Sequence, residues 1–311
     1  MSAVDTPAPA PAPQGTPADP AVRRKARVAT TESGRAQTRT GRRVLSTVAV
    51  VLAVIWVFPI YWMINSAFLP LNKLQTTKPT FFPLDATISN FRRVWNDPTF
   101  WDAMKISLTV VVMVLVAALI FAFLAALAVS RFRFKGRKSF ILVILVVQMI
   151  PAEGLFISQY RMLDGWNLVN TAAGLALVYT AAILPFTIWM LRGFVAGVPI
   201  ELEEAAMVDG LSRTVAFFRI TFPLLAPGLV AAGVYGFLQA WNEYTLALVV
   251  MTDPTKHTLP LWLQGLVESN RATDWGVVMA GSALIAVPVI IFFLFVQNKM
   301  TSGLVAGAVK G

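Results

Sequence analysis

The chain has 311 residues, of which 57% are hydrophobic and 14% charged, and its mean hydropathy is +0.67. This balance is far more apolar than that of a soluble globular domain and indicates a protein that crosses a membrane several times. The absence of cysteine excludes disulfides, thiolate metal sites and a cysteine nucleophile, and a single histidine, His257, excludes a multi-histidine metal site. The net charge of +10 is compatible with nucleic-acid binding, but basic residues in a membrane protein mainly set its orientation, so no nucleic-acid partner is expected.

Residues 1–43 are rich in proline, alanine and threonine and then in arginine, with little apolar surface to bury. This composition predicts a disordered, basic tail on the cytoplasmic side. Its arginines can bind anionic membrane lipid headgroups, although holding the N-terminus on the inner side is the simpler role.

The first expected span runs from Val44 to about Ile64, long enough to cross a bilayer as a helix. It begins too late for a cleaved signal peptide, and it carries Trp56 and Trp62 toward its far end, as an aromatic belt does. The segment that follows, to about Lys105, is rich in proline and is expected to be an external loop with short helical pieces.

Five further apolar stretches are expected to span the membrane, at about 106–129, 139–160, 171–191, 224–250 and 275–297. Residues 44–311 would then form one six-helix transmembrane domain with both ends on the same side. The expected inner segments hold 18 Lys and Arg and the outer segments 8, so the positive-inside rule places both termini in the cytoplasm.

Prolines interrupt several of these stretches, at positions 151, 185, 227 and 288. Each removes a backbone hydrogen bond that a neighbour must replace. The resulting breaks either line a translocation path or kink the helices to improve packing.

Residues 199–223 form the longest segment after the first span that is not simply apolar, and they are expected on the cytoplasmic surface. Pro199 and the acids that follow it favour a short helix as far as Asp209. Gly210 is expected to stop this helix, and Ser212 to cap a second one that runs through Ile220. Pro223 is then expected to open the next span.

The spacing in this segment resembles the EAA loop of ABC importer permeases. It consists of Glu204-Ala205-Ala206, three residues, Gly210, nine residues, Ile220, one residue, and Phe222-Pro223, with Phe222 where that family usually has leucine. Other segments are similar to the sugar-transporting, maltose-permease-like branch: Leu184-Pro185-Phe186 with Trp189, Leu191-Arg192-Gly193-Phe194, Ala240-Trp241-Asn242-Glu243, Thr252-Asp253-Pro254 and the C-terminal Ala306 to Gly311. Together they cover most of the chain from about Val44 to its end.

The resemblance implies an all-α, multi-pass inner-membrane protein with the type I ABC importer permease fold and no catalytic activity of its own. It also implies its partners: a second permease subunit, two ATP-binding subunits, an extracytoplasmic solute-binding protein and a sugar substrate. ATP and magnesium would bind the partner subunits, and this chain would hold no cofactor or metal. The loop residues implied to couple it to the ATPase are Glu203, Glu204, Ala205, Ala206, Asp209, Gly210, Arg219 and Pro223.

Polar residues in the expected third and fifth spans are the candidates for a substrate path. Gln239 and Glu243 are four apart and are expected to share one helix face with Trp241 and Asn242 nearby. Amides and carboxylates can bind sugar hydroxyls, and an aromatic ring can cover the apolar face of a sugar. A structural contact that gates the outer mouth would need the same residues.

The third span adds Gln148 and Glu153 to these candidates. A charge within the bilayer is costly and needs a partner or water, so Glu153 either lines a substrate-specific wall or reaches the outer interface or a partner subunit. Ser158 and Gln159 also depart from the apolar and proline pattern of the resembling sequences, which supports the wall. Gln148 either contacts substrate or bonds between helices.

Two alternatives remain at this point, and a third is excluded. An importer for another solute, such as a polyamine or phosphate, would have the same loop. An ion-coupled carrier could use Glu153 and Glu243, but it would not need the EAA loop. A membrane-embedded enzyme is excluded by the lack of a catalytic constellation.

Overall fold

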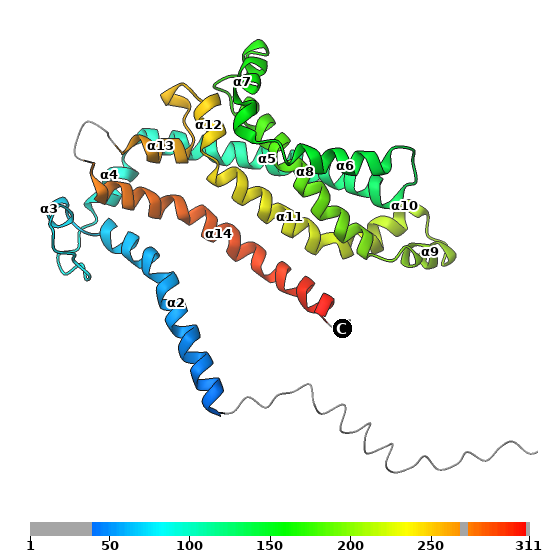
Figure 1. The fold of residues 1–311 in the computed structure, drawn as a ribbon, viewed down its shortest axis with the longest axis horizontal. Helices are drawn as coiled ribbons and strands as arrows, with labels where there is room; N and C mark the ends of the chain where they lie inside the picture. Colours follow the sequence, from blue (N-terminus) through cyan, green and yellow to red (C-terminus); the bar gives the residue numbers. More distant parts are fainter. Residues whose placement is uncertain (1–38, 268–272, 309–311) are drawn as a thin grey trace, which may run out of the picture. The chain divides into compact units, whose positions relative to one another are not determined.

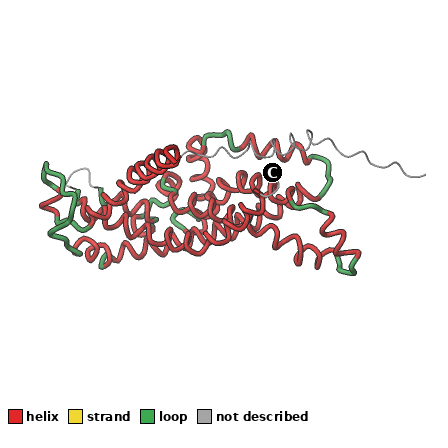
Figure 2. Tube along the Cα trace, turned by 90° about the horizontal axis from the view of Figure 1, so that it is seen from below, coloured by secondary structure: helices red, strands yellow, loops and turns green. Residues whose placement is uncertain are grey.

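The computed structural model describes residues 39–267 and 273–308, and most of the predicted tail lies outside these ranges. Within them the chain is helical, with no strand, as Figure 2 shows. The all-α prediction is therefore confirmed. The chain divides into two units, Met1–Pro59 and Ile60–Gly311, and each is described by itself.

The first helix, α2, spans Arg39–Ala67, so it begins in the first unit and ends in the second. It contains the predicted span Val44–Ile64, but it starts before residue 43, where the tail was expected to end. Arginine is a good helix former and no helix breaker stands between Arg39 and Val44 apart from Gly41, so the helix extends into the basic segment.

The segment after α2 contains two short helices, α3 (Leu71–Leu74) and α4 (Ser89–Trp95), which confirms the predicted short pieces. The next helix, α5 (Pro98–Arg131), starts earlier than the expected residue 106. The reason lies at its N-terminus: the Asp97 side chain accepts a hydrogen bond from the Thr99 N–H, and Pro98 occupies the first helical position, where its missing N–H costs nothing.

The expected third span is not one helix. It consists of α6 (Arg137–Val147), a 3₁₀ turn (Ala152–Leu155) and α7 (Phe156–Gly165), and the two arms are bent by 95°. Pro151 lies in the break, where it lacks the N–H that would continue the helix. Among the described residues, five helices are long and apolar enough to cross a membrane, or up to six if the bent pair counts as one span.

The rest of the second unit begins with α8 (Ala172–Gly197) and α9 (Glu201–Val208). A continuous run follows, formed by α10 (Arg213–Ala216), a π-helical segment (Phe217–Thr221) and α11 (Phe222–Asn242). Pro223 therefore does not open a separate helix, because the N–H of Phe222 reaches back to the Phe217 carbonyl and keeps the run intact. The chain then forms α12 (Thr245–Val250), a 3₁₀ turn (Pro254–Lys256), α13 (Leu259–Gly265) and α14 (Trp275–Ala308).

The core of the second unit lies where α5, α8 and α11 pack against one another, as Figure 1 shows. On α5 the buried residues recur about every four positions. Toward the C-terminal end of the helix these buried residues are alanines, Ala118, Ala122 and Ala126, none of them more than 2% exposed. Small side chains at this spacing let neighbouring helices approach closely inside a membrane. The core thus holds α8 and α11, the two helices that flank α9, in fixed positions.

Candidate functional site

The short helix α9 begins with three acids, Glu201, Glu203 and Glu204, at the end where the helix dipole favours negative charge. It ends at Gly210, which has a φ of +92°. The Leu211 N–H then donates to the Ala206 carbonyl at 3.1 Å, which completes a left-handed C-cap. The predicted helix and its glycine stop are confirmed.

The second predicted cap is also present. The Ser212 hydroxyl oxygen accepts a hydrogen bond from the Val215 N–H at 3.4 Å and starts α10. The chain therefore makes a helix, a tight left-handed turn and a second helix that continues as α11. This arrangement ties the orientation of α9 to the long helix.

A buried ion pair anchors α9 to the bundle. Glu203 Oε1 lies 3.4 Å from the Arg131 guanidinium at the end of α5, and these side chains are 8% and 12% exposed. The same oxygen accepts a hydrogen bond from the Thr221 hydroxyl at 2.7 Å, and Arg131 Nη2 donates to the Val198 carbonyl at 3.1 Å. Charge-assisted bonds of this kind are stronger than neutral ones, so three segments distant in sequence are held at one point.

Two of the residues implied to meet the ATPase are buried in this structure. Glu203 is 6% exposed and Ala206 4%, and both face the bundle, so they position α9 rather than present a surface. They are three apart, which places them on one side of a helix. Arg131 and Thr221 could not be predicted as partners of Glu203, because nothing in the sequence pairs positions so far apart.

The opposite face of α9 is open. Glu204, Ala205, Asp209 and Gly210 are exposed there, as are Arg219 and Pro223 on the following run. Apolar side chains accompany them: Leu202 is 41% exposed, Met207 37% and Val208 87%. Acidic and apolar side chains thus share one exposed face, which is called the α9 surface below.

The fifth-span candidates do not form the shared face that the sequence predicted. Glu243 has left the helix and caps α12, where its carboxylate accepts hydrogen bonds from the Leu246 and Ala247 N–H groups at 2.7 and 3.0 Å. Because α11 ends at Asn242, Gln239 and Glu243 lie on different segments. The carboxylate is occupied by the backbone it organises.

Trp241 is part of the core. It is 2% exposed and stacks on Phe237 with the ring centroids 5.6 Å apart, so its face is not available to a sugar. Asn242 and Gln239 are exposed, and each donates a hydrogen bond within its own helix, Asn242 to the Leu238 carbonyl and Gln239 to the Tyr235 hydroxyl. Of this set, only the two amides remain accessible.

Gln148 and Glu153 both lie at the break between α6 and α7, and both are exposed. A cavity of about 440 Å³ opens beside this break, and Gln148 is one of its lining residues. Glu153 does not line it. The structure therefore separates two residues that the sequence placed along one path.

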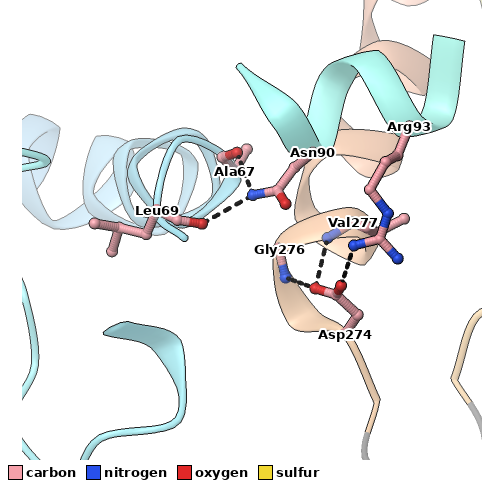
Figure 3. Close-up of polar contacts among 7 residues, drawn as sticks. All are labelled: Ala67, Leu69, Asn90, Arg93, Asp274, Gly276 and Val277. Carbon is pink, nitrogen blue, oxygen red and sulfur yellow. Dashed lines mark hydrogen bonds and ion pairs between the residues drawn. The ribbon is translucent and has the colours of Figure 1, made fainter. Parts of the chain in front are cut away.

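In Figure 1, α4 lies at the end of the second unit away from α9. There it joins the end of α2 to the start of α14, as Figure 3 shows. The buried Asn90 amide donates to the Ala67 and Leu69 carbonyls at 2.9 and 2.8 Å. Arg93 forms an ion pair with Asp274, whose carboxylate also accepts a hydrogen bond from the Gly276 N–H. Two helices distant in sequence are thus clamped through one short helix.

Replacing Asn90 by Leu is expected to lower the stability of the purified protein by about 2–3 kcal/mol, because two buried carbonyls would lose their donor. The measurement is thermal unfolding in detergent. Asn96→Leu, at an exposed asparagine that follows the same helix, is the matched control and should change little. Equal unfolding temperatures for the two variants would contradict this role of Asn90.

A second brace holds the loop after α12. Asn170 Oδ1 accepts a hydrogen bond from the Asp253 N–H at 2.8 Å, and the Asn170 amide donates to the Thr252 hydroxyl at 3.1 Å. The backbone N–H and the hydroxyl of Thr255 both donate to Asp253, which holds the pKa of that carboxyl below its usual value. The Thr252-Asp253-Pro254 segment is therefore a turn that these hydrogen bonds hold in place.

Metal-binding chemistry is not visible in the described part of the chain, where no cluster of three or more His, Cys, Asp or Glu residues could hold an ion. The polar groups of interest are instead the α9 surface, its buried anchor and the cavity at the α6–α7 break.

A helical membrane bundle with a short surface helix anchored between two of its spans is the architecture of an importer permease. Residues 118–300 match the family described as the binding-protein-dependent transport system inner membrane component, and the chain belongs to that family. It is thus a multi-pass membrane protein and a transport component.

Relatives in this family support the assignment over most of the chain. The diacetylchitobiose uptake system permease protein DasC of Streptomyces coelicolor is 45% identical over 263 residues, which cover 85% of this chain and 95% of DasC. The trehalose/maltose transport system permease protein MalG of Thermococcus litoralis is 35% identical over 270 residues, again 85% of this chain and 95% of the relative.

A solved structure confirms the fold. A bacterial ABC transporter involved in the import of alginate contains a chain that superposes with a TM-score of 0.72 at 23% identity, covering 84% of this chain and 98% of that one. The predicted type I importer permease fold is therefore confirmed.

Proposed function

We propose that this chain is one transmembrane subunit of an ATP-driven, binding-protein-dependent importer of a neutral sugar or oligosaccharide. The observation that carries the proposal is the α9 surface: an exposed acidic and apolar helix held rigidly by the Glu203–Arg131 pair in a chain of this family. Such a helix can transmit a push from a docked partner because its inner side is fixed to two spans.

The sugar assignment rests on the relatives. Two relatives are named for diacetylchitobiose and for trehalose and maltose, all of them neutral and rich in hydroxyl groups. A polyamine or phosphate importer is not favoured by these likenesses. The identity of the sugar would depend in large part on the separate binding protein.

The proposed partners follow from the mechanism. Two ATP-binding subunits would dock on the α9 surface and its counterpart in a second permease, and ATP and magnesium would bind to those subunits. A solute-binding protein would deliver sugar on the far side. ATP binding would close the pair of ATP-binding subunits, and α9 would move with the subunit on which it docks. The bundle would then alternate between inward-facing and outward-facing states, because ATP binds one of these states better.

Basic residues support the proposed orientation. Arg131, Arg133, Lys135, Arg137 and Lys138 lie at and after the end of α5, and Arg131 contacts α9. The positive-inside rule then places the α9 end in the cytoplasm, where an ATPase can reach it. The cluster of α4, Asn90 and Asp274 would lie at the outer side.

Mass-spectrometric identification of the proteins that co-purify with this chain from native membranes in mild detergent tests the assembly. We expect an ATP-binding subunit and a second, different permease. Recovery of the chain alone, from a preparation that still transports, would refute the ATP-driven proposal and favour an ion-coupled carrier.

Changes on the α9 surface are expected to abolish uptake without loss of the protein from the membrane. Glu204→Lys reverses the charge of an exposed residue, and Gly210→Val forces a branched side chain into a left-handed backbone conformation. At least a tenfold fall in sugar uptake by membrane vesicles is expected for each.

The controls are the same changes elsewhere. Asp164→Lys lies on an exposed part of α7, and a side chain at Gly265 would meet no other atom within 4 Å, so Asp164→Lys and Gly265→Val should leave uptake within about twofold. Normal uptake by both α9-surface variants would argue against docking at this surface.

A further inference from the structure

The cavity of about 440 Å³ lies where the broken α6–α7 pair meets α8, α11 and α12. Its size is within the range of about 300–1,000 Å³ that holds small-molecule ligands. The walls come from residues of all five helices and of the break itself: Val147, Gln148, Ile150, Ala152, Leu155, Gln159, Ala181, Ala182, Pro185, Phe186, Tyr235 and Leu246. Figure 1 shows α6, α8 and α11 side by side in this region.

Two hydrogen-bond acceptors at this cavity lack a donor that they would be expected to have. Gln159 Oε1 is buried and has no hydrogen-bond partner among the described residues. Pro185 has no N–H, so it cannot donate to the carbonyl of Ala181, four residues earlier on the cavity wall. Gln159 Oε1 and the Ala181 carbonyl are thus two acceptors on residues that line the cavity.

Hydrogen-bond donors and aromatic rings also line the cavity. The Tyr235 hydroxyl accepts a hydrogen bond from Gln239 at 3.2 Å, which leaves its own proton free to be donated, and the exposed Gln148 amide can both donate and accept. The Phe186 and Tyr235 rings lie with centroids 4.5 Å apart and both line the cavity. A ligand with hydroxyl groups and apolar C–H faces matches both features.

Charge decides the ligand class. The lining contains no carboxylate, ammonium or guanidinium group, and Glu153, although close in sequence, is not part of it. A polyamine or a phosphate bound here would lose its water without gaining a counter-charge. A neutral, polyhydroxylated molecule would not meet this cost.

We infer that this cavity is a binding subsite for a neutral saccharide unit, with Gln159 and Tyr235 as its specificity-determining residues. The inference rests on the proposed function and deepens it, because it assigns to this subunit its own contact with the sugar during passage. Gln148 lies at the end of α6 and would contact the ligand from the side of the break. Trp241 and Glu243, the stronger candidates from sequence, take no part.

The lack of cysteine in the chain gives a direct test. Ala182→Cys places one thiol of this subunit on the cavity wall, at an exposed and small residue, and keeps every polar group of the subsite. In the complete detergent-solubilised importer, we expect 10 mM N,N′-diacetylchitobiose to slow maleimide labelling of this thiol at least threefold. This protection corresponds to a site whose Kd for the sugar is on the order of a millimolar. Labelling at Gln264→Cys, exposed on α13, should not respond.

Two results of this experiment would overturn the subsite. Labelling of Ala182→Cys that is unaffected by sugar means that the sugar does not enter the cavity. No labelling at all means that a partner subunit or lipid covers it. If the unmodified importer takes up the sugar in either case, the proposed function stands and only the subsite fails; if it takes up no sugar, the proposed function fails first.

Variants of the two specificity residues give a second, independent measurement. Gln159→Leu and Tyr235→Phe, each in the Ala182→Cys chain, should raise the sugar concentration needed for half-protection about tenfold, whereas Gln264→Leu should not. ATP hydrolysis stimulated by the loaded binding protein should stay within twofold for the Gln264→Leu control, which lies outside the cavity. Unchanged half-protection in both pocket variants would overturn their assignment, and if Gln159→Leu does not fold, Tyr235→Phe decides.

Discussion

Replacing Glu203 by Gln is expected to lower sugar uptake at least tenfold, although this side chain faces the bundle and not the surface. The change leaves the Arg131 guanidinium buried without its counter-charge. Removing one partner of a buried ion pair typically costs about 3–5 kcal/mol, and this cost falls on the contact that fixes α9. Arg131→Met should have a similar effect, measured by uptake and by ATP hydrolysis in the reconstituted importer.

The double variant Arg131→Met with Glu203→Gln distinguishes anchoring from docking. It removes both charges, so no charge stays buried and uncompensated, and most of the uptake should return. If Glu203 touched the ATPase directly, the double variant would stay inactive. Glu201→Gln, at the exposed acid two positions earlier, is the matched control and should stay within twofold of the parent.

The second large effect is expected at Gly174, which lies in the first turn of α8. A methyl group there would be 2.1 Å from the Leu168 carbonyl oxygen, which is backbone and cannot rotate away. The same oxygen accepts the Thr171 hydroxyl at 2.7 Å, while the Gly174 N–H donates to that hydroxyl oxygen at 3.0 Å. We expect Gly174→Ala to cost about 3 kcal/mol or more and to lower the yield of folded protein severalfold.

Gly233→Ala provides the comparison, since its added methyl group would lie 3.8 Å from a Leu119 methyl carbon, an ordinary contact. Alanine also favours a helix more than glycine, so this variant should be as stable as the parent or slightly more stable. Thermal unfolding of the detergent-purified chains gives the answer. Equal losses in both variants would mean that the α8 cap is not a tight packing point.

Much of the fold could be predicted because long apolar stretches and helix punctuation are local signals. The span positions, the glycine stop at Gly210 and the cap at Ser212 each depend on a few neighbouring residues. The errors lie where one residue changes the path of the chain. Pro151 turned an expected span into two arms at 95°, and Glu243 ended α11 early by capping the next helix.

The site was less predictable because its key contacts join distant positions. Periodicity could place Glu203 and Ala206 on one side of α9, but it could not say that this side faces Arg131 and Thr221. Gln159 stood out only as a departure from an apolar pattern, and its role depends on Tyr235 on another helix. Conversely, Trp241 and Glu243 looked chemically suitable for sugar binding, but Trp241 packs in the core and Glu243 caps α12.

The π-helical segment Phe217–Thr221 sets the direction in which α9 points. Ala216 and Thr221, five residues apart, are both buried, and the later buried positions Leu225 and Gly228 follow at spacings of four and three. In a regular helix five residues turn the side chain well away from the starting face, so the wide turn restores the phase. Losing one residue here would rotate α9 and α10 by about 100° relative to the bundle. The length of this segment, more than its side chains, therefore decides where a docking partner finds its surface.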